Sequence, residues 1–173
     1  MEQHVFKMGL IQFCVFLLIS VLTLLVTLWF IKRFISKKYH IEDYNTAYGI
    51  FTGGLVISVF YIISGLITPI ISTLKLLDNI SGSWMYILES AKHISVLLLV
   101  AMVSAFIICF LAIKLSKRFF IGLIVFNEIK NNRIGIAVFV AVILIAFSLV
   151  LRDSLQLLFD SFVPYPEMPN FLN

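Results

Sequence analysis

The sequence predicts an all-α membrane protein whose four transmembrane helices form two tandem two-helix repeats. Three observations lead to this fold class. Of the 173 residues, 61% are hydrophobic, only 13% are charged, and long uncharged apolar runs occur four times along the chain. A soluble domain carries roughly 25% charged residues. A globule of this size cannot bury so much apolar surface, so lipid must solvate much of the chain.

The four apolar runs have the length that a transmembrane helix requires. A hydrocarbon core of about 30 Å takes about 20 helical residues. The expected spans are residues 10–31, 47–74, 94–113 and 134–151, the last with an apolar extension to residue 162. The runs are continuous rather than alternating, which favours helices over barrel strands. Residues 1–173 are therefore expected to form a single membrane domain.

The distribution of basic residues predicts the orientation of the spans. Lys and Arg concentrate in cytoplasmic loops. Nine of the 13 follow the first or the third span, and we expect these two basic loops in the cytoplasm: Lys32, Arg33, Lys37, Lys38, Lys114, Lys117, Arg118, Lys130 and Arg133. Both termini then lie outside. The basic residues are interpreted as topology determinants and lipid headgroup contacts, not as a nucleic-acid-binding surface.

The second and fourth spans resemble each other at an offset of 88 residues. At that offset small residues align with small residues: Ala47 with Gly135, Gly49 with Ala137, and Gly53 with Ala141. Each half then consists of two spans joined by a basic loop, and an even number of spans gives both halves one orientation. Chance similarity between two apolar helices is the alternative interpretation.

The start of the second span carries a recognisable motif. An acidic residue, a short polar stretch, Asn45-Thr-Ala-x-Gly and a Gly-Gly on the next turn resemble the domain-of-unknown-function-350 family of small bacterial inner-membrane proteins. The matching residues are Asn45, Ala47, Gly49, Gly53 and Gly54. The resemblance, over residues 40–72 and 126–150, implies four spans in two repeats and a place in the bacterial inner membrane. It implies no biochemical role.

The second copy of this motif, near residues 128–137, is degenerate. Glu128 and Ile129 fit the family pattern. Arg133 stands where the family has Asn, and Asn132 lies one residue early. A function that needs both copies is therefore not implied for this chain.

The second span also carries a stripe of small and polar residues at helical spacing. Beyond Ala47 these residues are Gly54, Ser58, Tyr61, Gly65, Thr68 and Ser72. In lipid, such a stripe must face protein or water. Two interpretations stay open: close packing against another helix, or the lining of a wetted path. Gly49 and Gly53 form a GxxxG motif on an adjacent face, and Pro69 is expected to bend the outer third of the span.

The outer end of the fourth span carries Asp153, Gln156 and Asp160 on one helical face. In a symmetric oligomer they would form acidic rings, which attract cations. Alternatively, they lie beyond the hydrocarbon, where water solvates them and Arg152 offsets their charge.

Two functional hypotheses follow. The first and third spans are apolar on all sides. The second has a stripe of small and polar residues and a separate glycine face, which together are more helix-packing surface than contacts within one four-helix unit require. This favours a homo-oligomer with a pore or channel-like path. The alternative is an anchor or sensor whose basic loops dock a cytoplasmic partner, as in a phage-defence or envelope-stress complex. The sequence has no P-loop and no Cys-x-x-Cys, His-Glu-x-x-His or Gly-x-Ser-x-Gly motif, so we expect neither an enzyme nor a metal or cofactor site.

Overall fold

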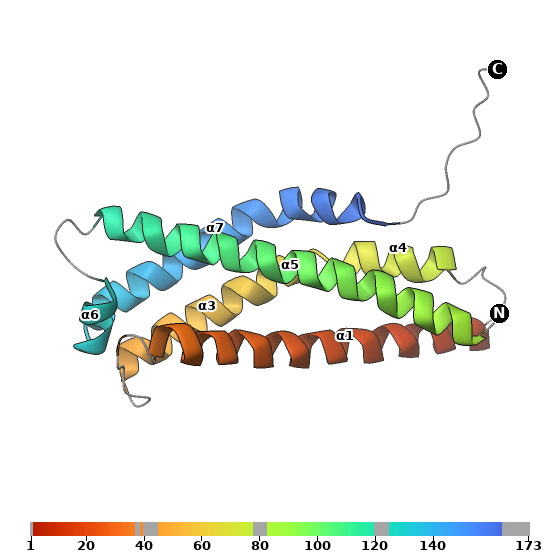
Figure 1. The fold of residues 1–173 in the computed structure, drawn as a ribbon, viewed down its shortest axis with the longest axis horizontal. Helices are drawn as coiled ribbons and strands as arrows, with labels where there is room; N and C mark the ends of the chain where they lie inside the picture. The colour runs from red at the N-terminus through yellow and green to blue at the C-terminus, as the bar shows by residue number, and fades with distance from the viewer. Residues whose placement is uncertain (1, 37–38, 40–44, 78–82, 120–124, 164–173) are drawn as a thin grey trace, which may run out of the picture.

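The computed structural model describes residues 2–36, 39, 45–77, 83–119 and 125–163. The helices are α1 (Glu2–Phe30), the π-helical segment η1 (Ile31–Ser36), α3 (Thr46–Ser64), α4 (Ile67–Leu77), α5 (Ser83–Phe119), α6 (Val125–Lys130) and α7 (Ile134–Asp160). They form an elongated bundle (Figure 1). One end holds the start of α1, the end of α4 and the start of α5. The other holds the start of α3, α6 and the start of α7.

Four helical stretches are long and apolar enough to cross a membrane. They are Gly9–Ser36, Thr46–Leu77, Met85–Arg118 and Ile134–Asp160. This confirms the predicted fold class, an all-α protein with four spans. The helices extend beyond the expected spans because their polar ends continue the helix past the hydrocarbon; α5, for example, includes Glu89 and Lys92 before its apolar run. The two-repeat organisation remains a prediction.

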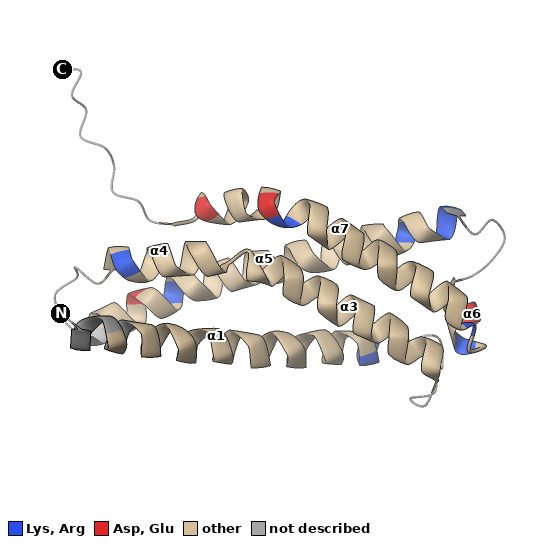
Figure 2. Cartoon of the chain, turned by 180° about the vertical axis from the view of Figure 1, so that it is seen from behind, with Lys and Arg blue, Asp and Glu red and all other residues tan. Residues whose placement is uncertain are grey.

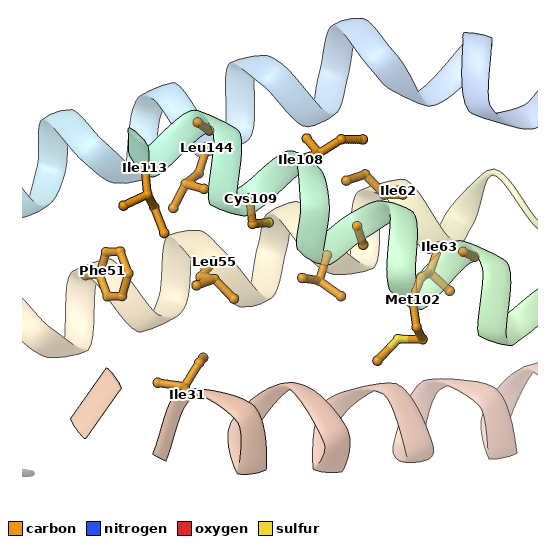
Figure 3. Packing of buried hydrophobic residues seen from close by; sticks show 14 of the residues in the cluster. Ile31, Phe51, Leu55, Ile62, Ile63, Met102, Ile108, Cys109, Ile113 and Leu144 are labelled. Atoms are coloured by element: carbon orange, nitrogen blue, oxygen red, sulfur yellow. The ribbon is translucent and has the colours of Figure 1, made fainter. Parts of the chain in front are cut away.

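The central pair of the bundle is α3 and α7. Where they cross, Gly54 of α3 lies directly on Ala141 of α7: a Cβ atom added to Gly54 would lie 2.5 Å from the Ala141 Cβ. Only small residues allow two helix backbones to approach this closely. The third helix of the core is α5, which brings Ile108, Cys109 and Ile113 into one cluster with side chains of α3 and α7 (Figure 3).

The first helix, by contrast, lies at the edge of the bundle. Its buried residues follow one another every fourth position, and the rest of its apolar surface is largely exposed. The buried stripe consists of Ile19, Thr23, Thr27, Ile31 and Ile35. A helix with one narrow buried stripe and apolar residues elsewhere is suited to face lipid.

The second span is broken at the start of its C-terminal third. Its two parts, α3 and α4, are separated by Gly65 and Leu66, whose backbone N–H groups bond to the carbonyl oxygens three residues earlier. Pro69 has no N–H to donate to the Gly65 carbonyl oxygen, and its ring crowds that carbonyl. The bend that Pro69 predicts is therefore a short interruption of the helix just before the proline.

The apolar segment at residues 119–126 contains the end of one helix and the start of another. α5 continues to Phe119, and a separate short helix, α6, begins at Val125. Residues 120–124 lie outside the described part of the chain.

Candidate functional site

The stripe of the second span turns largely toward the protein in its N-terminal half. Gly54 and Ser58 are buried, and the Ser58 hydroxyl donates to the Gly54 carbonyl oxygen at 2.7 Å. Gly65 is also buried, whereas Ser72 is half-buried and Thr68 is exposed. Within one chain, the N-terminal part of the stripe thus packs against α7.

Arg152 of α7 reaches across to the break in the second span. Its Nε donates to the Ser64 hydroxyl oxygen at 3.0 Å, and its guanidinium carbon lies 5.3 Å from the centroid of the Tyr61 ring. Ser64 is the last residue of α3 and in turn donates to the Tyr61 carbonyl oxygen at 2.6 Å. A helix C-terminus attracts cations through its unpaired carbonyl groups and its dipole. The break therefore provides Arg152 with several stabilising contacts.

The depth of this contact follows from α1. Ser64 lines a groove together with Ile19 and Ser20 of α1. Residues 8–31, from α1 to the first residue of η1, carry no charged side chain, and Ile19 and Ser20 stand at the midpoint of that run. Ser64 and its partner Arg152 therefore lie beside the midpoint of the uncharged run of α1, whereas the uncharged run of α7 itself ends at Leu151. An arginine that reaches the hydrocarbon core is costly, so Arg152 is a functional candidate by position.

The carboxylate beside Arg152 is exposed. Asp153 has an Oδ1 atom 3.5 Å from an Arg152 terminal nitrogen, and its side chain is 85% exposed, against 32% for Arg152. Gln156 and Asp160 are half-buried, and Asp160 Oδ1 is buried without a hydrogen-bond partner among the described residues. The three residues share a face by spacing, but only Asp153 projects freely from the chain.

Asp153 stands on a face of α7 that the rest of the chain does not cover. We name it the open α7 face; its residues are exposed and recur at helical spacing: Val142, Ala146, Leu149 and Asp153. Similarly, Gly49 and Gly53 of α3 are exposed, and a Cβ atom added to either would meet nothing within 4 Å. Figure 2 shows α3 and α7 side by side in front of α5. The GxxxG motif therefore has no packing partner among the described residues.

The start of α3 is held by two asparagines. The Asn45 side-chain amide donates to the carbonyl oxygens of Ile129 and Lys130, each at 2.8 Å. Its side-chain oxygen accepts from the Tyr48 backbone N–H at 3.1 Å, so the same residue caps α3. Asn132, at a positive φ of 58°, accepts from the Ala47 backbone N–H at 3.0 Å.

This geometry explains the displaced asparagine of the second motif. Asn132 does not cap its own helix but binds the start of α3. Arg133 occupies the cap position of α7, makes no side-chain capping bond and pairs with Glu128 at 2.8 Å. Sequence reasoning missed this contact between the halves. The sequence feature that could have indicated this contact is Asn132 itself, because asparagine tolerates positive φ and here it stands just before an apolar helix.

The predicted basic loops lie at the α6 end of the bundle, where Figure 2 shows several segments of the ribbon coloured blue for Lys and Arg. Their described cations are exposed: Lys32, Arg33, Lys114, Lys117, Arg118, Lys130 and Arg133. Some of this charge is engaged locally. Arg33 lies 5.9 Å from the Trp29 ring centroid and Lys117 lies 5.4 Å from that of Phe126. The remaining two, Lys37 and Lys38, lie outside the described residues.

Comparison with known proteins identifies a family. The model of a family described as Domain of Unknown Function (DUF350) matches residues 5–155. No curated protein and no solved structure matches the chain. The matched range includes the start of α3, its break and Arg152. As the resemblance predicted, the chain belongs to the domain-of-unknown-function-350 family.

Proposed function

We propose that this protein is a homo-oligomer of the bacterial inner membrane in which the open α7 face of each subunit borders a narrow polar path. The observation that carries the proposal is Asp153. Its carboxylate is 85% exposed and adjoins Arg152, which lies level with the middle of the apolar run of α1.

A lipid-facing carboxylate at that depth is energetically unfavourable. Insertion scales give about 2.5–3.5 kcal/mol for an aspartate at the centre of a transmembrane helix. Arg152 lies at 3.5 Å but leaves most of the Asp153 side chain uncovered. Water in a path, or a neighbouring subunit, would remove this cost. In a symmetric oligomer the Asp153 residues of all subunits form a ring, and acidic rings favour cations.

The glycines of α3 supply a surface on which subunits can meet. Gly49 and Gly53 lie one turn apart with open space above both. Glycines at this spacing let a second helix approach closely in lipid, where dispersion contacts drive helix association. The two uncovered faces thus have separate roles in the proposal: packing on α3 and a polar lining on α7.

The orientation is part of the proposal. The α6 end holds most of the basic residues, so it faces the cytoplasm and both termini lie outside. Figure 2 agrees with this arrangement in showing the α6 end as rich in Lys and Arg among the described residues. The Asp153 ring then lies between the middle of the bilayer and its outer surface.

Ion flux in liposomes tests the path. Reconstituted wild-type protein is expected to pass monovalent cations, and Asp153→Asn to lower cation flux about tenfold. Glu89→Gln is the matched control, because Glu89 is an acid on α5 whose described ion-pair partner is His93 of the same helix. The absence of flux at every voltage and pH, with the Asp153 variant equal to wild type, would contradict the proposal.

A second candidate function is docking of a cytoplasmic partner, as in a phage-defence or envelope-stress complex. It rests on Lys117, Arg118 and Lys130, which are exposed and have no ion pair among the described residues. Co-purification of a partner that is lost in Lys117→Glu/Arg118→Glu/Lys130→Glu would favour docking over conduction.

A further inference from the structure

An aromatic-lined pocket opens between α1 and α5 near the basic end of the bundle. It has a volume of about 550 Å³. Leu55 of α3 lies at its base, Phe30 and Phe34 belong to the α1 side, and Phe106 and Phe110 belong to α5. A pocket of 300–1,000 Å³ with mainly apolar walls is the usual setting for a small bound molecule.

The pocket depends on the way α1 ends. The wide π-helical turns of η1 bury Ile31 and Ile35 against the bundle. Phe30 stacks on Phe106 at 4.4 Å between ring centroids and also packs on Phe34 at 4.7 Å. These ring contacts join α1 and η1 to α5 in the wall of the pocket. Such π-helical turns are frequent at functional sites.

The pocket is amphipathic along its length. Its apolar end is at Phe106, and its charged lining residues are Lys114 and Lys117, one turn apart on α5 and both exposed. From Phe106 to Lys117 the helix rises about 16 Å at 1.5 Å per residue. That distance is close to one leaflet, half of a core of about 30 Å. No ion pair among the described residues engages either lysine.

We propose that this pocket binds an anionic phospholipid of the leaflet beside the basic loops. One acyl chain lies among the phenylalanine rings, and the phosphate contacts Lys114 and Lys117. Charge complementarity selects this occupant. The lining has cations without a described acidic neighbour, which suits a headgroup of net negative charge better than a zwitterionic one. The site is distinct from the open α7 face and does not require the protein to conduct ions.

Fluorescence quenching tests the proposal. Phe110→Trp places a reporter on the pocket wall, in a Trp29→Phe/Trp84→Phe background that removes the native tryptophans. The full chain is reconstituted in mixed phosphatidylglycerol and phosphatidylcholine vesicles, with brominated acyl chains on one lipid at a time. Bromine quenches tryptophan on close approach. Brominated phosphatidylglycerol is expected to show about tenfold higher relative affinity than brominated phosphatidylcholine.

Two charge variants test whether the pocket lysines cause the preference for phosphatidylglycerol over phosphatidylcholine. Lys114→Gln/Lys117→Gln is expected to abolish the preference, so that the relative affinity falls from about tenfold to about one. The matched control Arg118→Gln/Lys130→Gln removes the same charge from the same end of the bundle but from residues that do not line the pocket. It is expected to keep the tenfold preference. Size-exclusion profiles and circular dichroism of all variants verify that they are folded.

Each other outcome overturns the proposal. Equal quenching by both lipids in the wild-type pocket would mean that no anionic lipid is selected. An equal loss in the two charge variants would assign the preference to overall surface charge. No quenching by either lipid would mean that protein, either a second copy or another segment of this chain, fills the pocket.

Discussion

Both ends of α3 are held by polar contacts with the second half of the chain, yet the two ends differ in how completely their polar side chains are paired. At the start, Asn45 and Asn132 bond to four backbone groups, and the site is closed. At the end, Arg152 binds Ser64 while Asp153 beside it stays exposed. A fully paired polar cluster stabilises a fold, whereas a partly paired one at hydrocarbon depth needs something outside the chain.

The largest expected effect lies between these two ends, where α3 crosses α7. Gly54→Leu would place a side chain into the Ala141 backbone, so it should lower the free energy of unfolding by about 3 kcal/mol. Denaturant titration in detergent measures this. Gly49→Leu is the matched control, because the space above Gly49 is open; it should unfold like wild type but weaken the oligomer. Equal destabilisation by both would contradict the α3–α7 crossing.

Next in size is the closed end of α3. Asn45→Ala removes a helix cap and two donated hydrogen bonds, so we expect a loss of about 2–3 kcal/mol. Asn45→Asp keeps the capping acceptor and loses the donated bonds. Its free energy of unfolding should therefore lie between those of the wild type and Asn45→Ala. Cation flux per folded protein should stay at the wild-type level. If Asn45→Ala were as stable as wild type but had altered cation flux, Asn45 would act in conduction rather than in stability, which contradicts the role assigned to it here.

A smaller effect is expected at Asn132. Asn132→Gly keeps the positive φ of 58° accessible and loses only the bond to Ala47, which should cost about 1 kcal/mol. Asn132→Ala loses that bond and also strains the backbone, so thermal unfolding should place it below the glycine variant. The opposite order of the two variants would rule out this role for Asn132.

The smallest effect on stability is expected at the partly paired end. Arg152→Gln leaves a side chain that can still bond to Ser64, and water in the path should keep Asp153 solvated. We expect a change below about 1 kcal/mol in unfolding together with several-fold higher cation flux, because the fixed positive charge is gone. A loss of several kcal/mol would instead indicate that Arg152 and Asp153 form a buried ion pair, because removal of one partner leaves the other charge buried and unpaired.

Much of the fold is predictable from the sequence because lipid imposes a simple length rule. The four uncharged runs give the spans, and Pro69 indicates where the second span is interrupted. The crossing of α3 on α7 was not predictable in detail. It depends on the close approach of Gly54 to Ala141, and in sequence the stripe on the second span is compatible with both packing and pore lining.

The candidate site was only partly predictable for the same reason. Asp153, Gln156 and Asp160 stood out as an acidic face, but their depth depends on which residues of α3 and α1 lie beside α7. Arg152 was interpreted only as a balancing charge, because nothing in a single sequence indicates that it meets Ser64 at a helix break. The role of Asn132 was also hidden, since it caps a helix other than its own.

The accessibility of position 153 to water tests the central claim most directly. In a Cys14→Ser/Cys109→Ser background, Asp153→Cys is treated in vesicles with a charged, membrane-impermeant thiol reagent. The matched control is Leu18→Cys on α1, 63% exposed and next to the groove residue Ile19 at the level of Ser64. We predict rapid modification of Asp153→Cys, or a disulfide between subunits, and no reaction of Leu18→Cys. Protection of both positions would show that lipid covers the open α7 face and would contradict the account.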